Sequence, residues 1–256
     1  MSNPRHRIST WLESCTKHAM DFVFPVQCAL CGTKEFLSDA RLGCYCHPCI
    51  EELCPRPINR CQCCGAEIGL YAQTADGCTH CRNRTLRFES VVCLGMYEGS
   101  LRQAILAAKW SFSAVRMRSL GKLLAQQRQR ELQELRIDRV VPIPQHWRQR
   151  LVRHFNPAWI IAEEIAAQLN VPCDAQLLSR QRRTRAQKRV AVSQRFSNQT
   201  DSFSVKSCSA EGQRMLIVDD VLTSGATCSE AARLLKRCHA ASCHAAVLGR
   251  VLDHSA

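Results

Sequence analysis

The fold is decided by the stretch Met215-Leu216-Ile217-Val218-Asp219-Asp220-Val221-Leu222-Thr223-Ser224-Gly225-Ala226-Thr227, an apolar run that ends on two carboxylates and continues into a hydroxyl-rich turn. Residues 215–218 suit a buried parallel strand and residues 229–236 a helix, so residues 223–227 are predicted to form the turn between them. Backbone N–H groups at such a turn, with the helix dipole, favour an anion. The acid pair can accept hydrogen bonds from vicinal hydroxyls, so the stretch predicts a site for a sugar phosphate such as ribose 5-phosphate.

Strand-like and helix-like segments alternate through the second part of the chain. We expect strands at 91–94, 138–144, 215–219 and 244–248 and helices at 99–109, 118–134, 157–169 and 226–238. Asn156 is the expected N-cap of the third helix, with Pro157 at its first position. This alternation predicts an α/β fold with a mostly parallel sheet and helices on both faces. Ligands bind such sheets at the carboxyl ends of strands, where the acid pair falls.

Residues 218–227 resemble the phosphoribosyl pyrophosphate (PRPP) signature of type I phosphoribosyltransferases. A P-loop would need a Gly-Lys-Ser/Thr ending, which this segment lacks. The resemblance implies a sheet of the phosphoribosyltransferase type. It also implies that magnesium binds the pyrophosphate group of PRPP. It implies that Asp219 and Asp220 hold the ribose hydroxyls and take part in catalysis, and that the 5-phosphate is bound by Thr223, Ser224, Gly225, Ala226 and Thr227. Phosphoribosyl transfer passes through an oxocarbenium-like state as pyrophosphate leaves, so cations around the leaving group matter more than a nucleophile.

Cysteines mark a separate N-terminal region, because eleven of the eighteen fall between positions 28 and 81. Four Cys-x-x-Cys pairs stand there: Cys28/Cys31, Cys46/Cys49, Cys61/Cys64 and Cys78/Cys81. Each pair presents two thiolates to one ion, which predicts two tetrahedral zinc sites in a double zinc-ribbon module. Sequential pairing of the first two and of the last two pairs needs no chain crossing and is preferred, with interleaved pairing as the alternative. Four thiolates leave no open position on the ion, so both sites are expected to be structural.

The cysteine clustering predicts a module of residues 1–88, with a packing helix over Trp11 to Val26 and the zinc ribbons, followed by a phosphoribosyltransferase-like domain of residues 89–256. No run of about eighteen uninterrupted apolar residues is present, so no membrane span is expected. No secretory h-region follows the N-terminus, and in a reducing cytoplasm disulfides are the poorer explanation for the paired cysteines. We therefore expect a cytoplasmic protein.

Several further motifs resemble the ComF/GntX family of zinc-ribbon and phosphoribosyltransferase-like proteins, over about residues 20 to 250. They are Ala107-Ala108-Lys109-Trp110, Val141-Pro142-Ile143-Pro144, Arg153-His154-Phe155-Asn156, Arg183-Thr184 with Gln187, and Arg195 with Asn198. His154 stands where the family has glycine, Ser224 replaces a threonine, and Cys63 adds a thiol inside one pair. The resemblance implies that Lys109 is the catalytic cation at the leaving pyrophosphate; the alternative is an ordinary lysine at the end of a helix.

A strongly basic segment covers residues 180–189, with six basic residues in ten: Arg180, Arg182, Arg183, Arg185, Lys188 and Arg189. By position it resembles the flexible loop that closes over PRPP and excludes water. It can also be a strip that tracks the phosphates of single-stranded DNA, or a solvated charged loop. The formal net charge of +13 favours a phosphate-bearing partner of some kind.

Two functions remain open from the sequence. The first is a PRPP-binding, phosphoribosyltransferase-like protein that acts in DNA uptake or utilisation, as the family resemblance implies, and contacts single-stranded DNA and DNA-processing proteins. The second is an active phosphoribosyltransferase that transfers phosphoribose from PRPP to an unidentified acceptor. The family resemblance favours the first function, whereas the intact acid pair and loop favour the second, because a pure scaffold need not keep them.

Overall fold

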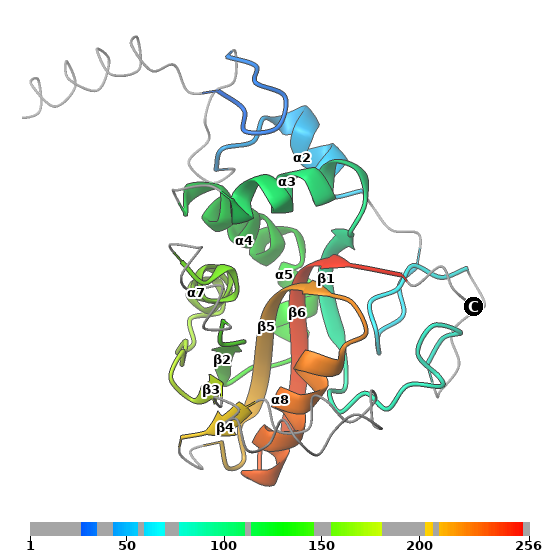
Figure 1. Cartoon of the computed structure of the whole chain (residues 1–256), viewed down its shortest axis with the longest axis vertical. Coiled ribbons are helices and arrows are strands. Elements are labelled where there is room, and N and C mark those ends of the chain that lie inside the picture. The colour runs from blue at the N-terminus through cyan, green and yellow to red at the C-terminus, as the bar shows by residue number, and fades with distance from the viewer. Residues whose placement is uncertain are drawn as a thin grey trace, which may run out of the picture.

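The structure is a computed structural model that describes residues 27–34, 43–55, 59–69, 77–110, 114–145, 155–180, 203–206 and 210–252. Its centre is a four-stranded sheet in the order β1 (Val91–Met96), β6 (Ser242–Arg250), β5 (Arg214–Leu222) and β2 (Arg139–Pro142). All three neighbouring pairs are parallel (Figure 1). The predicted α/β fold with a mostly parallel sheet is confirmed.

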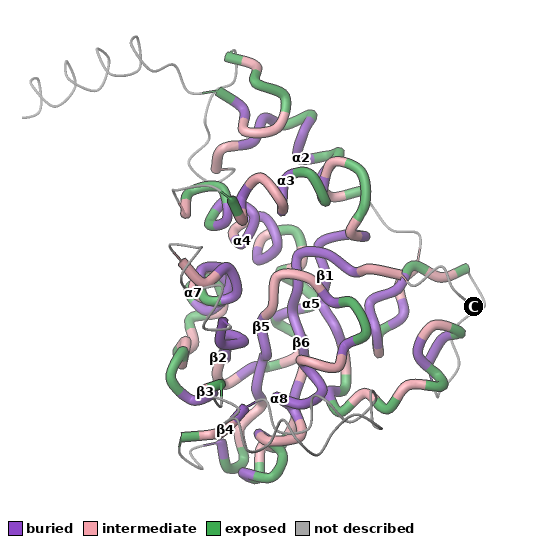
Figure 2. The backbone as a smooth tube through the Cα atoms, in the orientation of Figure 1, coloured by how far each residue is buried: buried purple, intermediate pink, exposed green. Residues whose placement is uncertain are grey.

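Helices cover both faces of this sheet. The helices α3 (Gly99–Lys109), α4 (Val115–Gln127) and α7 (Pro157–Leu169) pack on one face, and α8 (Ala226–Arg237) packs on the other. Neighbouring residues of β5 alternate between these two cores: Leu216 and Val218 join the first, Met215 and Ile217 the second. A strand buried on both faces is uniformly apolar, as in residues 215–218. Figure 2 shows the same burial along β5 and β6.

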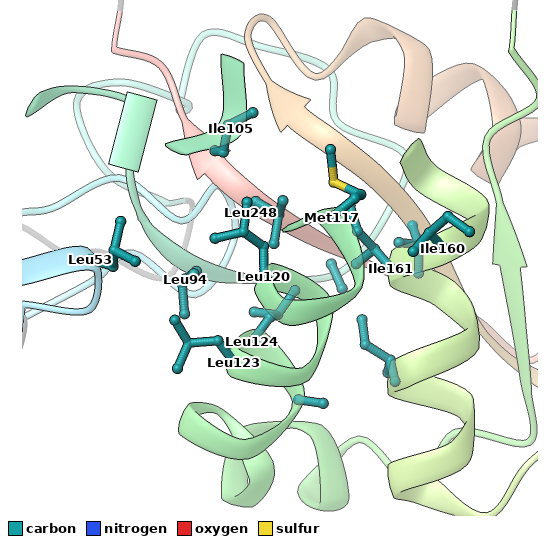
Figure 3. Close-up of a cluster of buried hydrophobic side chains, with 14 of the residues drawn as sticks. Leu53, Leu94, Ile105, Met117, Leu120, Leu123, Leu124, Ile160, Ile161 and Leu248 are labelled. Atoms are coloured by element: carbon teal, nitrogen blue, oxygen red, sulfur yellow. The ribbon is translucent and has the colours of Figure 1, made fainter. Parts of the chain in front are cut away.

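The first core also takes in a helix from the Cys-rich region. Leu120 and Leu124 of α4 lie among side chains from β1, β6 and α7, as Figure 3 shows. Leu53, at the end of α2 (His47–Leu53), belongs to the same cluster and is fully buried. Burying one such leucine stabilises the fold by about 1.5–3 kcal/mol. The Cys-rich region is thus packed onto the helical layer.

Three elements differ from their predicted form. The helix expected over 118–134 is two helices, α4 and α5 (Gln129–Glu134), which meet at Arg128. A two-stranded antiparallel sheet of β3 (Leu178–Arg180) and β4 (Phe203–Val205) was not expected, because strands of three residues carry no periodic signal. The strand expected over 138–144 is shorter, Arg139–Pro142; the Ile143 N–H still donates to the Val218 carbonyl at 2.8 Å, and Pro144 then has no N–H to donate.

Other expectations hold, or lie outside the described residues. Asn156 caps α7, its Oδ1 accepting a hydrogen bond from the Ala158 N–H at 3.2 Å, and Pro157 is the first helical residue. The helix expected over Trp11 to Val26 lies outside the described residues. Among the helices that are described, none has the length and apolar character needed to cross a membrane.

The second half of the Cys-rich region runs along β1, an edge strand of the sheet. The Val91 N–H donates to the Gln62 carbonyl at 2.9 Å. Arg60 Nη1 donates to the Cys93 carbonyl at 2.6 Å, and Arg128 Nε donates to the same carbonyl at 3.0 Å. These contacts use backbone groups that an edge strand otherwise leaves unpaired. The domain boundary at residue 88 stays a prediction, and the two parts share this interface.

Candidate functional site

The acid pair lies near the carboxyl end of β5, where it meets a lysine from another element. Asp220 Oδ2 is 2.9 Å from Lys109 Nζ, and the two side chains are only 18% and 12% exposed. Asp219 Oδ1 accepts a hydrogen bond from the Asp220 N–H at 2.8 Å. The fold therefore brings together the three residues predicted to be catalytic, two on β5 and one at the end of α3.

The environment of Asp219 favours its neutral form. Burial, and after it the neighbouring Asp220 carboxylate, raise the pKa of Asp219 to about 7. The Asp220 N–H, Lys109 and Arg180 act in the opposite direction without cancelling this effect. A buried carboxyl group with a raised pKa beside a second carboxylate is typical of sites that bind hydroxyl donors or cations. The pair is thus suited to the hydroxyls of a sugar.

The raised pKa predicts a pH-dependent penalty on folding. Because the folded-state pKa of Asp219 lies above its unfolded value of 3.8, the folded chain holds this proton more tightly, and stability is lost as pH rises from about 4 to about 7. Asp219→Asn, which mimics the protonated form, should therefore gain stability over wild type across this range, with no further gain at higher pH. Urea unfolding of both proteins at pH 5, 6, 7 and 8 measures the difference. A pH-independent difference would contradict the raised pKa.

Arg180 belongs with the acid pair. It ends β3, its Nε donates to the Pro144 carbonyl at 2.8 Å, and its guanidinium lies 4.9 Å from the centre of the Phe203 ring. Burial lowers the pKa of Arg180, while the charge of Asp219 acts in the opposite direction. The other basic residues of the segment, Arg182, Arg183, Arg185, Lys188 and Arg189, lie outside the described residues. Arg180 therefore anchors the start of the basic segment beside Asp219.

The predicted loop forms the turn between β5 and α8. Thr223 and Ser224 are exposed, Gly225 is buried with φ of 80°, and α8 begins at Ala226. A Cβ at Gly225 would lie 3.0 Å from Leu86 Cδ2, so both conformation and space favour glycine. Ser224 Oγ accepts from the Ala226 N–H at 3.3 Å, and Thr227 follows in the first turn of α8. An exposed turn that leads into a helix N-terminus is suited to a phosphate.

Sequence reasoning missed one residue that holds this loop. Arg250, at the end of β6, is 2% exposed. Its Nη1 donates to the carbonyls of Leu222 at 3.1 Å and of Thr223, and its Nε donates to the Cys64 carbonyl at 2.8 Å. The surrounding sequence Gly249-Arg250-Val251 is that of an ordinary strand end, and it carries no local signal of this role.

The eight paired cysteines form two clusters with the sequential grouping. Cluster 1 consists of Cys28, Cys31, Cys46 and Cys49, and cluster 2 of Cys61, Cys64, Cys78 and Cys81. Within each cluster the four sulfurs lie within 4.8 Å of one another, and the closest pairs are 3.6 to 3.8 Å apart. Thiolates at about 2.3 Å from a tetrahedral zinc are about 3.8 Å apart, so both clusters fit a structural zinc.

Backbone donors also support thiolates at these positions. The Cys46 N–H donates to Cys28 Sγ and the Cys78 N–H to Cys81 Sγ, both at 3.3 Å. Burial raises the pKa of Cys28, but N–H groups of Cys31, Cys46 and Leu30 outweigh it and lower the value to about 6. A lowered pKa favours the metal-binding thiolate. Cys44, Cys54, Cys63 and His80, which stand in the same region of the sequence, belong to neither cluster.

Comparison with known proteins agrees with this architecture. The family model of the phosphoribosyl transferase domain matches residues 157–253, the span from α7 to β6 that contains the acid pair and the loop. The chain is similar to competence protein F of Haemophilus influenzae, with 25% identity over 75% of this chain and 84% of that protein. It is 28% identical to the DNA utilization protein YhgH of Salmonella typhimurium, over 89% of this chain and 98% of that protein.

A solved purine phosphoribosyltransferase from Pyrococcus horikoshii is 14% identical, covers 62% of this chain and 78% of its own, and has a TM-score of 0.31, a likeness too weak to carry an argument. The relatives cover most of the chain, the transferase domain model covers the acid pair and the loop, and both cysteine clusters are in place. These similarities support a ComF-like assignment for this chain, whose Cys-rich region precedes the phosphoribosyl transferase domain.

Proposed function

We propose that this protein binds PRPP with magnesium at the acid pair and the loop of residues 223–227, and acts in the uptake or utilisation of DNA. The observation that carries the first part is the arrangement at the end of β5, where Asp219 and Asp220 lie between the Lys109 ammonium and an exposed turn that opens α8. The names of its relatives, a competence protein and a DNA utilization protein, support the second part.

Each group in the site has a distinct task in this proposal. Asp219 and Asp220 accept hydrogen bonds from the two ribose hydroxyls, and N–H groups of the loop and of the first turn of α8 bind the 5-phosphate. Lys109 lies where it can neutralise the pyrophosphate. Magnesium, when bound with PRPP, supplies further positive charge to the pyrophosphate oxygens. Arg180 adds a cation on the β3 side of the pair.

Calorimetry of the zinc-loaded chain tests the binding. Titration with PRPP in the presence of magnesium should give one site per chain, and ribose 5-phosphate alone should bind more weakly, because it lacks the pyrophosphate that Lys109 is proposed to contact. Pyrophosphate alone serves as the complementary control, since it lacks the ribose hydroxyls. Equal affinity for PRPP and pyrophosphate would exclude a role for the acid pair in ribose recognition.

The basic segment is proposed to contact single-stranded DNA, and this contact should depend on salt. Replacing Arg182, Arg183, Arg185, Lys188 and Arg189 with glutamine is expected to flatten the dependence of log affinity on log salt, by about 0.7 for each phosphate that these side chains neutralise. Fluorescence anisotropy with a labelled oligonucleotide at several salt concentrations measures the slope. Arg118→Gln is the matched control, because this half-exposed arginine pairs with Glu164 at 2.6 Å on the helical layer. A slope unchanged by the five substitutions would assign the segment another role.

The alternative function is catalytic transfer of phosphoribose to an acceptor. The position of Lys109, 2.9 Å from Asp220 and next to the site proposed for pyrophosphate, favours it, because a leaving pyrophosphate needs a cation. A screen of nucleobases and other acceptors for pyrophosphate release from PRPP separates the two functions. Acceptor-dependent release establishes an enzyme, whereas PRPP binding without release supports a binding role alongside DNA-processing proteins.

A further inference from the structure

One buried arginine joins cluster 2 to the loop of residues 223–227. The guanidinium of Arg250 donates hydrogen bonds to the carbonyls of Cys64, Leu222, Thr223 and Val251. Within the described part of the chain, no carboxylate forms an ion pair with it. Burying a cation is unfavourable in free energy unless several acceptors form hydrogen bonds with it. As long as the guanidinium stays in place, it therefore fixes these four carbonyls relative to one another.

A second set of contacts supports the same turn from the same side. The segment that leaves cluster 2 passes Gly225, where a Cβ would lie 3.0 Å from Leu86 and 3.5 Å from Phe88. Between them, the Arg87 N–H donates to Ser229 Oγ in the first turn of α8, at 3.1 Å. Gly225 therefore packs against residues 86–88, and Arg250 links the carbonyls of Leu222 and Thr223 to a ligand residue of cluster 2.

Cluster 1 has different neighbours. The Cys44 N–H, between its two cysteine pairs, donates to Ser119 Oγ of α4 at 3.1 Å. Ile50 and Leu53 of α2 belong to the core beneath the helical layer. Among the described residues, the cluster 1 cysteines form no hydrogen bond with the loop of residues 223–227. The two clusters therefore differ in their connection to the site.

From this asymmetry we infer that Arg250 is a positioning residue that transmits the folded state of cluster 2 to the phosphate-binding loop, so that metal in cluster 2 sets the affinity of the loop for PRPP. The inference rests on the proposed binding of PRPP. With metal bound, the Cys64 carbonyl is a fixed anchor for Arg250, and the loop N–H groups are held ready for a phosphate. Without metal in cluster 2, the loop must become ordered when PRPP binds, and this ordering lowers the affinity for PRPP.

Substitution of Arg250 in the zinc-loaded full chain tests the link. Arg250→Gln should weaken magnesium-PRPP binding by about tenfold or more, the usual effect of losing hydrogen bonds from a charged group, and should speed hydrogen exchange at residues 222–227. Zinc content, by elemental analysis, should stay at two per chain. Arg250→Lys should be intermediate, because an ammonium keeps the charge without the planar set of donors.

Arg128→Gln is the matched control. Arg128 is also largely buried and also donates to two backbone carbonyls, those of Cys93 and Leu94 at 3.0 and 2.9 Å, but these partners belong to β1 and not to the loop. Arg128→Gln should reduce the stability of the chain about as much as Arg250→Gln does, without changing the affinity for PRPP. If Arg128→Gln weakens PRPP binding as much as Arg250→Gln does, the effect is general destabilisation and the inference is wrong.

The metal itself is tested by single cysteine substitutions. Cys78→Ser in cluster 2 should weaken PRPP binding and loosen residues 222–227, whereas Cys46→Ser in cluster 1 should leave both nearly unchanged. These two variants decide the question if Arg250→Gln fails to fold. Equal affinity for PRPP in Cys78→Ser and Cys46→Ser would overturn the inference.

Failure of the proposed PRPP binding can be distinguished from failure of the coupling through Arg250. If the wild-type chain does not bind PRPP, that function is wrong, but hydrogen exchange at residues 222–227 without ligand still reports whether Arg250 and cluster 2 order the loop. Unchanged exchange in both Arg250→Gln and Cys78→Ser would exclude the coupling whatever the chain binds.

Discussion

Replacing Asp219 and Asp220 together with asparagine is expected to reduce binding of magnesium-PRPP by about a hundredfold or more. Both carboxylates are proposed to accept hydrogen bonds from ribose hydroxyls, and each bond to a charged group contributes about 1.5–3 kcal/mol. The amides keep the side-chain volume but lose the charge, and they also leave Lys109 without its partner at 2.9 Å. Calorimetry at pH 8 compares the two proteins above the pKa of about 7 for Asp219, where most of this carboxyl group is ionised in the wild type.

Asp138→Asn provides the control for this experiment. Its carboxylate accepts two hydrogen bonds from the Arg214 guanidinium, at 2.8 and 2.9 Å, at the opposite end of β5 from the acid pair. The substitution should affect stability without affecting PRPP binding. Equal affinity in wild type and the Asp219, Asp220 double variant would show that the acid pair does not hold the ribose.

Withdrawal of zinc is expected to produce the second large effect, a cooperative loss of structure in the Cys-rich region and a marked fall in the melting temperature. Structural zinc contributes an apparent free energy of about 10–16 kcal/mol in finger peptides, which is comparable to the whole stability of an ordinary domain. Both clusters are packed against the rest of the chain, cluster 1 through the core under α4 and cluster 2 through β1. Thermal unfolding before and after chelation measures the change, and added zinc should reverse it.

A cysteine outside the clusters serves as the comparison. Cys243 is fully buried on β6, and Cys243→Ala should retain two zinc ions and lose only about 1–2 kcal/mol from the smaller side chain. Removing one cluster ligand, as in Cys64→Ser, should instead lose one zinc ion. Fewer than two zinc ions in the wild-type chain would contradict the assignment of both clusters as metal sites.

The strand-turn-helix unit around Asp219 could be predicted from sequence because its signals are local. An apolar run, two acids and a glycine-containing turn follow one another, and β5 and α8 lie where these signals predicted. The start of α7 was equally predictable, since the cap and the proline stand side by side. Signals from neighbouring residues were therefore enough to predict those elements whose structure is determined locally.

Contacts between distant segments could not be predicted in this way. The Lys109 and Asp220 pair and the Arg250 contact with Cys64 join residues far apart in the chain, so no spacing rule indicates them. The break at Arg128 has a similar cause, because the long helical pattern continues through it while its side chain donates to carbonyls of β1. Family resemblance pointed to Lys109 but gave no indication of Arg250.

The cover over β1 has a consequence for self-association. An open strand edge is a template on which a second copy of a chain can add a strand, the first step toward aggregation. Arg60 and Gln62, which occupy backbone groups of β1, stand on either side of the cluster 2 residue Cys61. Metal that orders this segment would therefore also keep the β1 edge covered, and a chain depleted of zinc is expected to be open to intermolecular pairing along β1.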